Sequence, residues 1–191
     1  MRVKATAGEI TTQQGFFNTV REKCGQPIEL CYQCQKCTAG CPMGEYVDIA
    51  PHQVVRMVYL SLADPVLTNS MIWLCSACET CGARCPNGIR ISEVNDVLRQ
   101  LSASLGREKE KRTATFHRMF LADVKSRGRV HESMLIARFK LKTGDLFSDL
   151  DLGLRLFQKG KLTLFSSAVR DKKGVREIFR RVEQARQKGG R

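Results

Sequence analysis

Helical periodicity dominates the hydrophobic pattern of this chain. Near the N-terminus, Phe16, Phe17 and Val20 would share one face of a short helix that precedes the first cysteine-rich stretch. No stretch shows the regular alternation of apolar and polar residues that is typical of a half-buried β-strand. The pattern therefore predicts an all-α fold.

Three further helices are expected around the cysteine-rich stretches. Asp48 and Pro51 signal the start of the first helix. Pro65 is expected to open the second, and Ser92 to cap the third, which Gly106 ends. The predicted apolar faces are Val54, Val55, Val58 and Leu62 in the first helix, Leu67, Met71, Ile72 and Leu74 in the second, and Val94, Val97, Leu98, Leu101 and Leu105 in the third.

From Arg107 onward the pattern stays helical but is less regular. The expected amphipathic segments are 113–126, 131–142, 146–158 and 174–187, separated by Gly128, Gly144, Gly160 and Gly174. Two apolar faces are predicted there, made by Phe116, Phe120, Leu121 and Val124, and by Leu146, Leu150, Leu154 and Phe157. These faces either cover the core of the first part or form a docking surface for a partner.

The distribution of charge divides the chain at about the same point. Hydrophobic residues make up 42% of the 191 residues, which is enough to bury a core. Residues 1–106 hold nine basic and nine acidic residues, whereas 107–191 hold 23 basic and ten acidic ones, which gives the whole net charge of +13. We therefore expect two domains, a cofactor-binding domain at 1–106 and a basic helical extension at 107–191 for subunit docking.

Eight of the nine cysteines form two identical runs. Cys31, Cys34, Cys37 and Cys41 precede Pro42, and Cys75, Cys78, Cys81 and Cys85 precede Pro86, so that each run reads C-x2-C-x2-C-x3-C-P. Every position in the second run lies 44 residues after its mate in the first, which makes the runs an internal repeat. This spacing is the bacterial motif for [4Fe–4S] clusters, in which three closely spaced thiolates wrap three corners of the cube.

The spacing also predicts which cysteines share a cluster. In two-cluster ferredoxins the fourth cysteine of each run binds the other cluster. By that rule Cys31, Cys34, Cys37 and Cys85 would hold one [4Fe–4S] cluster, and Cys75, Cys78, Cys81 and Cys41 would hold the second. The chain is thus expected to bind two clusters on eight cysteines.

Other readings of the cysteines are weaker. Zinc sites usually pair two C-x2-C knuckles, and disulfides are not expected in a reducing compartment. A radical enzyme would need C-x3-C-x2-C, but Gly44 and Gly88 stand where the last cysteine would be. Cys24 lies outside both runs and is expected to be structural, and the three histidines share no ligand spacing.

Signals for catalysis, membranes and secretion are not found in the sequence. It has no G-x-G-x-x-G loop, no P-loop and no adjacent pair of cysteines, so we expect an electron-transfer protein with no catalytic residue of its own. The longest uncharged stretch, 65–78, is too short to span a bilayer, and no signal peptide is recognised, so a cytoplasmic location is expected. Nucleic-acid binding by the basic part is an alternative of another class, weakened by the ten interspersed acids.

Two segments resemble the C subunit of heterodisulfide reductase. They are FNTVREKCGQPIELCYQCQKCTAGCPM at 17–43 and IWLCSACETCGARCPNGIRISEVNDVLR at 72–99, and the chain length and the tail sequences GRVHESMLIARFK and FQKGKL fit the same family. The cluster motifs are shared with α-helical ferredoxin modules of succinate dehydrogenase, fumarate reductase, and glycolate and glycerol-phosphate oxidoreductases. An iron–sulfur subunit of one of those dehydrogenases is therefore the alternative.

The resemblance implies more than the spacing does. It implies an α-helical ferredoxin fold, and a relay of electrons from an A subunit that carries flavin and clusters to a catalytic B subunit with CCG motifs. This chain has no CCG motif, which agrees with a separate B subunit. In methanogens the resemblance implies the mixed disulfide of coenzymes M and B as the final substrate, whereas related bacterial subunits serve other redox enzymes.

Overall fold

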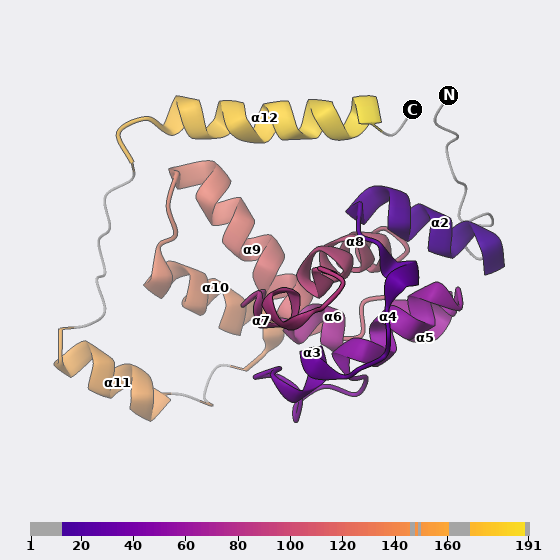
Figure 1. The fold of residues 1–191 in the computed structure, drawn as a ribbon. Coiled ribbons are helices and arrows are strands. Elements are labelled where there is room, and N and C mark those ends of the chain that lie inside the picture. Colours follow the sequence, from indigo (N-terminus) through magenta and orange to yellow (C-terminus); the bar gives the residue numbers. More distant parts are fainter. Residues whose placement is uncertain (1–12, 146–147, 149, 161–168, 190–191) are drawn as a thin grey trace. The chain divides into compact units, whose positions relative to one another are not determined.

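Helices joined by loops make up the structure, which is a computed structural model (Figure 1). It describes residues 13–145, 148, 150–160 and 169–189, and no β-strand occurs among them, so the predicted all-α fold is confirmed. The chain forms two compact units that divide between Lys111 and Arg112. We call residues 13–111 the cysteine unit, and the described residues from 112 onward the basic unit.

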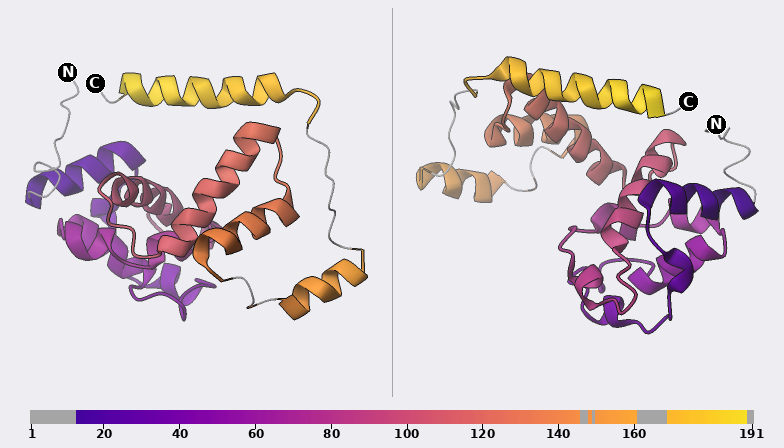
Figure 2. Two further views of the ribbon diagram at one scale, coloured as in Figure 1. Left: turned by 180° about the vertical axis from the view of Figure 1, so that it is seen from behind. Right: turned by 45° about the horizontal axis from the view of Figure 1, so that its top comes forward.

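The cysteine unit is built around one long central helix. Its helices are α2 (Gln13–Cys24), η1 (Ile28–Leu30), α3 (Lys36–Ala39), α4 (Pro51–Tyr59), α5 (Ala63–Leu67), α6 (Met71–Leu74), α7 (Thr80–Arg84) and α8 (Ile91–Ser104). Helix α8 packs against α2, α4, α5, α6 and α7. Figure 2 shows this group of helices from two further directions. The two short helices α3 and α7 also pack against each other. Through these contacts the central helix fixes the relative positions of both cysteine runs.

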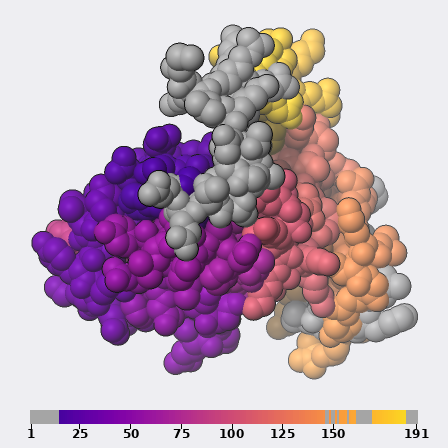
Figure 3. All heavy atoms as spheres, turned by 90° about the vertical axis from the view of Figure 1, so that its right-hand side faces the viewer, coloured from indigo at the N-terminus to yellow at the C-terminus, as the bar shows by residue number. Residues whose placement is uncertain are grey.

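Most of the predicted apolar faces form the core of the cysteine unit. Its largest fully buried side chains are Phe16, Ile28, Leu67, Ile72, Ile89 and Leu98. Most of each predicted face in α4 and α8 is confirmed, since Val54, Val55 and Val58 are buried, as are Val94, Val97, Leu98 and Leu101, whereas Leu105 follows α8 and is half-buried. Figure 3 shows part of the surface of this unit in indigo to magenta. Burial of this apolar area is the main stabilising term for the unit.

The helix predicted from Pro65 to Leu74 is two helices. Pro65 lies inside α5, which begins at Ala63, and the chain leaves the helix before α6 begins at Met71. The buried Asn69 makes this break, because its side-chain oxygen accepts a hydrogen bond from the Ile72 N–H at 3.1 Å and its amide donates to the Val66 carbonyl. The prediction for Leu62 is also wrong, since α4 ends at Tyr59 and Leu62 is 40% exposed.

Two residues predicted as helix signals have other roles. Helix α8 begins after Arg90, so Ser92 lies inside it, buried, and its hydroxyl donates a hydrogen bond to Glu79 at 2.6 Å. Asp48 does not cap α4, because the N-cap residue of this helix is Ala50. Instead its carboxylate accepts hydrogen bonds from the Ser70 N–H at 2.9 Å and the Ser70 hydroxyl at 2.7 Å. It also forms an ion pair with Lys109 at 2.5 Å, so that it joins three separate parts of the cysteine unit.

The ionisation of Asp48 reflects these contacts. Partial burial acts to raise its pKa, but the hydrogen bonds from Lys109 and Ser70 outweigh this effect and hold the pKa at about 2. Asp48 is therefore a charged, hydrogen-bonded cross-link at neutral pH.

The basic unit contains α9 (Lys111–Arg127), α10 (Glu132–Thr143), α11 (Leu150–Gln158) and α12 (Lys172–Gly189). These helices agree with the predicted segments, with one correction. Gly174 lies inside α12 instead of preceding it, because the helix begins earlier, where the Asp171 carboxylate accepts a hydrogen bond from the Gly174 N–H at 2.7 Å. Of the predicted apolar face at 146–157, Leu146 and the side chains of Leu150 and Phe157 lie outside the described part of the structure.

Packing within the basic unit is sparse. Of its described apolar side chains, the buried ones are Ala114 and Leu135. Large apolar side chains remain exposed by 36% or more at Phe116, Phe120, Leu121, Met134, Ile136, Leu141, Leu154, Ile178 and Val182. Helices α9 and α10 are joined by the buried Asp123, which accepts a hydrogen bond from the His131 N–H at 2.7 Å. Helices α9 and α12 are joined by an ion pair between Lys125 and Glu183 at 2.7 Å.

Among the helices that the structure describes in either unit, none combines the length and the apolar character that a membrane-spanning helix needs.

Candidate metal centres

The two cysteine runs fold into loops of the same backbone conformation. In each loop, two non-glycine residues between the cysteines have a left-handed backbone, with φ of 57° and 62° at Gln33 and Gln35 and of 51° and 60° at Ala77 and Glu79. These positions correspond at the offset of 44 residues. A left-handed non-glycine residue costs about 1–3 kcal/mol and persists where surrounding structure fixes it, which is common at functional sites. The internal repeat in the sequence is thus also a repeat in backbone geometry.

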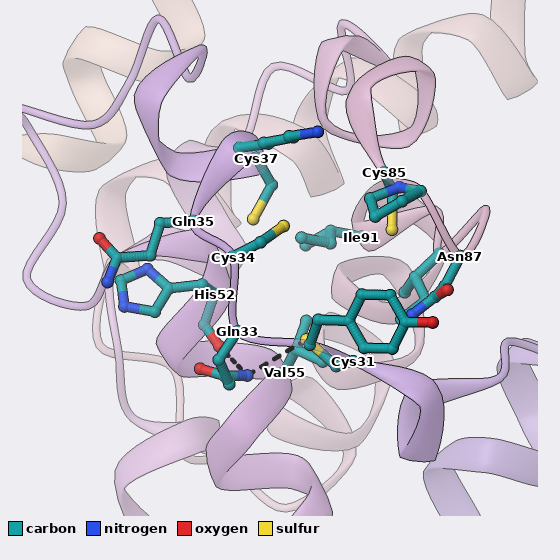
Figure 4. A pocket seen from close by; sticks show the side chains of 14 residues that line it. Cys31, Gln33, Cys34, Gln35, Cys37, His52, Val55, Cys85, Asn87 and Ile91 are labelled. Carbon is teal, nitrogen blue, oxygen red and sulfur yellow. Dashed lines mark hydrogen bonds between the residues drawn. The ribbon is translucent and has the colours of Figure 1, made fainter.

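One hollow gathers three cysteines of the first run and the last cysteine of the second. Its cysteines are Cys31, Cys34, Cys37 and Cys85, and we call it site 1 (Figure 4). The free space at the hollow, counted together with the solvent at its opening, is about 390 Å³. Its floor is apolar, made by Val55, Ile89 and Ile91. In Figure 4 the sulfurs of Cys34, Cys37 and Cys85 point toward one another across it.

A second hollow has the complementary set of cysteines. Site 2 is lined by Cys75, Cys78 and Cys81 from the second run and by Cys41 from the first. Its free space, counted in the same way, is about 350 Å³, similar to that at site 1. The structure therefore brings the eight predicted cysteines together in two groups of four, and the fourth cysteine of each run lies with the three of the other run. The spacing assigns the same groups to the two clusters, and that they bind clusters stays a prediction.

Site 1 is bordered by a network of hydrogen bonds that sequence reasoning missed. The Gln33 side-chain amide donates to the Cys31 sulfur at 3.1 Å and to the His52 carbonyl at 3.3 Å, as the dashed lines in Figure 4 show. The Thr38 hydroxyl lies 2.7 Å from His52 Nδ1 and 4.0 Å from the Cys37 sulfur. His52, one of the three histidines that share no ligand spacing, thus lies in the wall of site 1. No spacing in the sequence relates these residues, because α4 brings His52 to the loop only through helix packing.

The thiols of the two sites differ in acidity. Burial raises the pKa of Cys37 and of Cys81, which disfavours the free thiolates there. The hydrogen bond with the Thr80 hydroxyl, at 3.4 Å, lowers the pKa of the exposed Cys78. Since metals bind the thiolate, binding at the buried cysteines must replace protons.

The two loops meet closely at Gly40. A Cβ atom at this position would overlap the Arg84 guanidinium, so the side chain of Arg84 occupies the space that a larger residue would need. Arg84 precedes Cys85, and Gly40 precedes Cys41. The close contact therefore lies beside the two cysteines that are exchanged between the sites.

The donor set of each site fits an iron–sulfur cluster. All nine cysteines are free thiols, and four sulfurs line each hollow, as four-cysteine ligation of a [4Fe–4S] cluster requires. Within the described residues, no group of three or more His, Cys, Asp or Glu side chains is arranged to hold a single metal ion. Cys24 lies in neither hollow, is half-buried, and contacts the Arg21 carbonyl at 3.7 Å.

Comparison with known proteins identifies the cysteine-rich region. Residues 30–90 match the family described as "4Fe-4S dicluster domain", so this region is an iron–sulfur domain. Among similar proteins, the C subunit of an H2:CoB-CoM heterodisulfide, ferredoxin reductase from Methanothermobacter thermautotrophicus is 30% identical over 91 residues, which are 48% of this chain and 49% of that protein.

Two other archaeal relatives have similar names. The second iron–sulfur C subunit of the CoB–CoM heterodisulfide reductase from Methanocaldococcus jannaschii is 36% identical over 79 residues, 41% of this chain and 42% of the relative. The C subunit of the ferredoxin:CoB-CoM heterodisulfide reductase from Methanosarcina acetivorans is 38% identical over 84 residues, 44% of this chain and 34% of the relative. The chain thus matches about half or less of these relatives' lengths. The predicted resemblance to heterodisulfide reductase C subunits is confirmed for this region.

Proposed function

We propose that this chain is an electron-relay subunit that holds one [4Fe–4S] cluster at site 1 and another at site 2, in a complex of the heterodisulfide reductase type. The observation that carries the proposal is the exchange of Cys41 and Cys85 between the two hollows. A shared pair of ligands keeps two clusters close together, as electron relay requires. When bound, each cluster supplies one-electron redox chemistry, and the protein supplies its ligands and surroundings.

The residues around each site have distinct tasks in this proposal. The cysteine thiolates hold the irons. The left-handed backbone at Gln33, Gln35, Ala77 and Glu79 forms turns of the kind whose N–H groups surround anionic and iron–sulfur centres. Apolar side chains such as Val55 and Ile91 limit water on the inner side of site 1. Both hollows stay open on the outer side, where a redox partner can approach.

The proposed partners are an A subunit with flavin and iron–sulfur clusters and a catalytic B subunit with CCG motifs. The names of the relatives, which describe C subunits of heterodisulfide reductases, support this assembly. In the proposal the basic unit binds an acidic partner surface, and exposed apolar residues such as Phe116, Phe120 and Leu154 become buried in the contact. A cytoplasmic location is part of the proposal, because free thiols persist in a reducing compartment.

The metal content tests the proposed function most directly. Chain purified without oxygen should contain about eight iron and eight acid-labile sulfide per molecule and give an S = 1/2 signal on reduction. The variant Cys24→Ser is the matched control, because Cys24 is the one cysteine outside the two sites, and it should keep the same content. Stoichiometric zinc without sulfide would contradict the proposal.

Ligand substitution tests the crossed arrangement. Cys41→Ser should change the spectrum of the cluster bound by Cys75, Cys78 and Cys81, because Cys41 lines site 2. Cys85→Ser is the reciprocal variant and should change only the other cluster. Electron paramagnetic resonance of the reduced proteins can resolve the two signals. If each substitution altered the cluster of its own run, the crossed assignment would be wrong.

A further inference from the structure

The internal repeat allows the surroundings of the two sites to be compared position by position. Four positions that line the hollows differ in hydrogen-bonding capacity or charge. At one of them, Asn87 in site 1 corresponds to Met43 in site 2, and the Asn87 amide is already hydrogen-bonded to the Leu30 carbonyl, so the other three carry the comparison. Gln33 corresponds to Ala77, Gln35 to Glu79, and Lys36 to Thr80. Because the backbone of the two loops is alike, these side chains face equivalent parts of the two sites. Their differences should therefore act on the reduction potentials of the two clusters.

The first difference is a hydrogen bond to sulfur. The Gln33 amide donates to the Cys31 sulfur at 3.1 Å, and its second contact, to the His52 carbonyl at 3.3 Å, holds the side chain in place (Figure 4). Ala77 has no donor to offer at the equivalent position. A donor aimed at a cluster ligand stabilises the more negative, reduced state more than the oxidised state. Hydrogen bonds to the sulfurs accordingly raise the potential.

The second difference is charge. Lys36 lines site 1, and its positive charge favours the addition of an electron there. Glu79 lines site 2, and its negative charge opposes it. The effect of Glu79 is reduced but not removed, because Arg90 lies 3.6 Å from its carboxylate and both side chains are about half exposed. Both charges thus favour the electron at site 1.

Contacts at site 2 work in the opposite direction: the Ile91 and Ser92 backbone N–H groups hydrogen-bond the Cys81 sulfur, and the Thr80 hydroxyl contacts the Cys78 sulfur. The Thr80 hydroxyl lies 3.4 Å from the Cys78 sulfur in site 2, closer than the 4.0 Å between Thr38 and Cys37 in site 1. Cys78 is exposed, however, so this hydroxyl replaces a hydrogen bond that water would otherwise make. The Gln33 contact is part-buried, where a donor matters more.

We propose that site 1 is the electron-accepting end of the chain, because Gln33 and Lys36 raise the potential of its cluster while Glu79 lowers that of site 2. This inference rests on the proposed function, in which both sites hold [4Fe–4S] clusters. Transfer within the chain moves one electron from site 2 to site 1, so that one cluster is oxidised and the other reduced by the same electron, and no bond or proton is exchanged. The side chains of the two loops thereby give the relay a preferred direction.

A reciprocal exchange of the two loops tests the inference. The full chain carrying Q33A, Q35E, K36T, A77Q, E79Q and T80K has these three pairs of residues exchanged between the sites. Potentials are measured by redox titration followed by electron paramagnetic resonance, and Cys85→Ser identifies the signal of site 1. In the natural chain, site 1 should have the higher potential. The exchange should shift the ratio of the two reduction equilibria by at least tenfold toward site 2, which corresponds to about 59 mV for one electron.

Single variants test the inference even if the multiply substituted chain does not fold. Gln33→Leu should lower only the potential of site 1, and Glu79→Gln should raise only that of site 2. Gln100→Ala, on the exposed side of α8, is the control and should change neither.

Iron and sulfide analysis of each protein separates the two proposals. If the natural chain lacks clusters, the proposed function fails. If both clusters are present but site 2 has the equal or higher potential, or if Gln33→Leu leaves site 1 unchanged, only the present inference is overturned.

Discussion

The cysteine unit and the basic unit are ordered by different kinds of interaction. In the cysteine unit, α8 is surrounded by five other helices, and side chains such as Phe16, Ile72 and Leu98 are fully buried. In the described part of the basic unit, polar contacts such as Lys125–Glu183 join helices whose large apolar side chains are mostly exposed. Metal sites need ligands that are held by rigid surroundings. Both cysteine loops lie in the cysteine unit, whose packed helices provide such surroundings.

Truncation after Lys111 tests this difference between the units and should have the largest effect of the changes proposed here. If the basic unit serves docking, the shortened chain should keep both clusters, since the cysteine unit has its own core, but lose all stable association with the catalytic partner. Iron and sulfide analysis and co-purification measure the two outcomes. Loss of clusters or precipitation of the shortened chain would instead mean that the basic unit covers the core of the cysteine unit.

A milder variant sharpens the same test. Phe116→Ser with Phe120→Ser in the full chain removes exposed apolar side chains of the basic unit without shortening it. We expect weaker association with the partner and unchanged iron content. Unchanged association would exclude this face of α9 from the contact.

Single leucine substitutions should separate the two units by stability. Leu98 is fully buried in α8, so Leu98→Ala should lower the free energy of unfolding of the cysteine unit by about 2–5 kcal/mol. Leu154 in α11 is 58% exposed, so Leu154→Ala should change the free energy of unfolding by less than about 0.5 kcal/mol. Urea unfolding of the anaerobic proteins, followed by circular dichroism, measures both. A comparable loss for the two variants would show that Leu154 packs against a core after all.

The effect predicted for Asp48 is smaller than that of Leu98→Ala. Its pKa, about 2 in the folded protein, lies below the usual value of 3.8, so its contribution is complete above about pH 4 and is lost as the pH falls through 2. Because the side chain is one-third exposed, we expect Asp48→Asn to cost only about 1–2 kcal/mol at pH 7. Urea unfolding of both proteins at pH 7 and at lower pH measures the difference between their free energies of unfolding. The acid sensitivity of the rest of the chain is common to both proteins and cancels in this difference. Equal stability at pH 7 would contradict the cross-linking role.

Features with local signals were predictable from the sequence, and features that depend on distant contacts were not. Ligand spacing and helical periodicity are local, so the cysteine runs and the buried faces of α4 and α8 could be predicted. The break at Asn69 depends on hydrogen bonds of its side chain, which the sequence pattern does not show. Asp48 accepts hydrogen bonds from Ser70 and Lys109, which lie 22 and 61 positions away in the sequence. The Gln33–His52 contact likewise forms only when α4 packs beside the first loop.

The exchange of Cys41 and Cys85 between the sites also sets the order of events during synthesis. The four thiols of site 2 are not all translated until residue 81, and those of site 1 not until residue 85. At about 5–20 residues per second, the ribosome takes about 2–9 s to pass from Cys41 to Cys85. During that interval the nascent first loop presents three thiols without their fourth partner, open to oxidation or to capture of zinc. Delivery of clusters by the cell's assembly machinery is therefore expected to follow release of the second loop, and to fill both sites together.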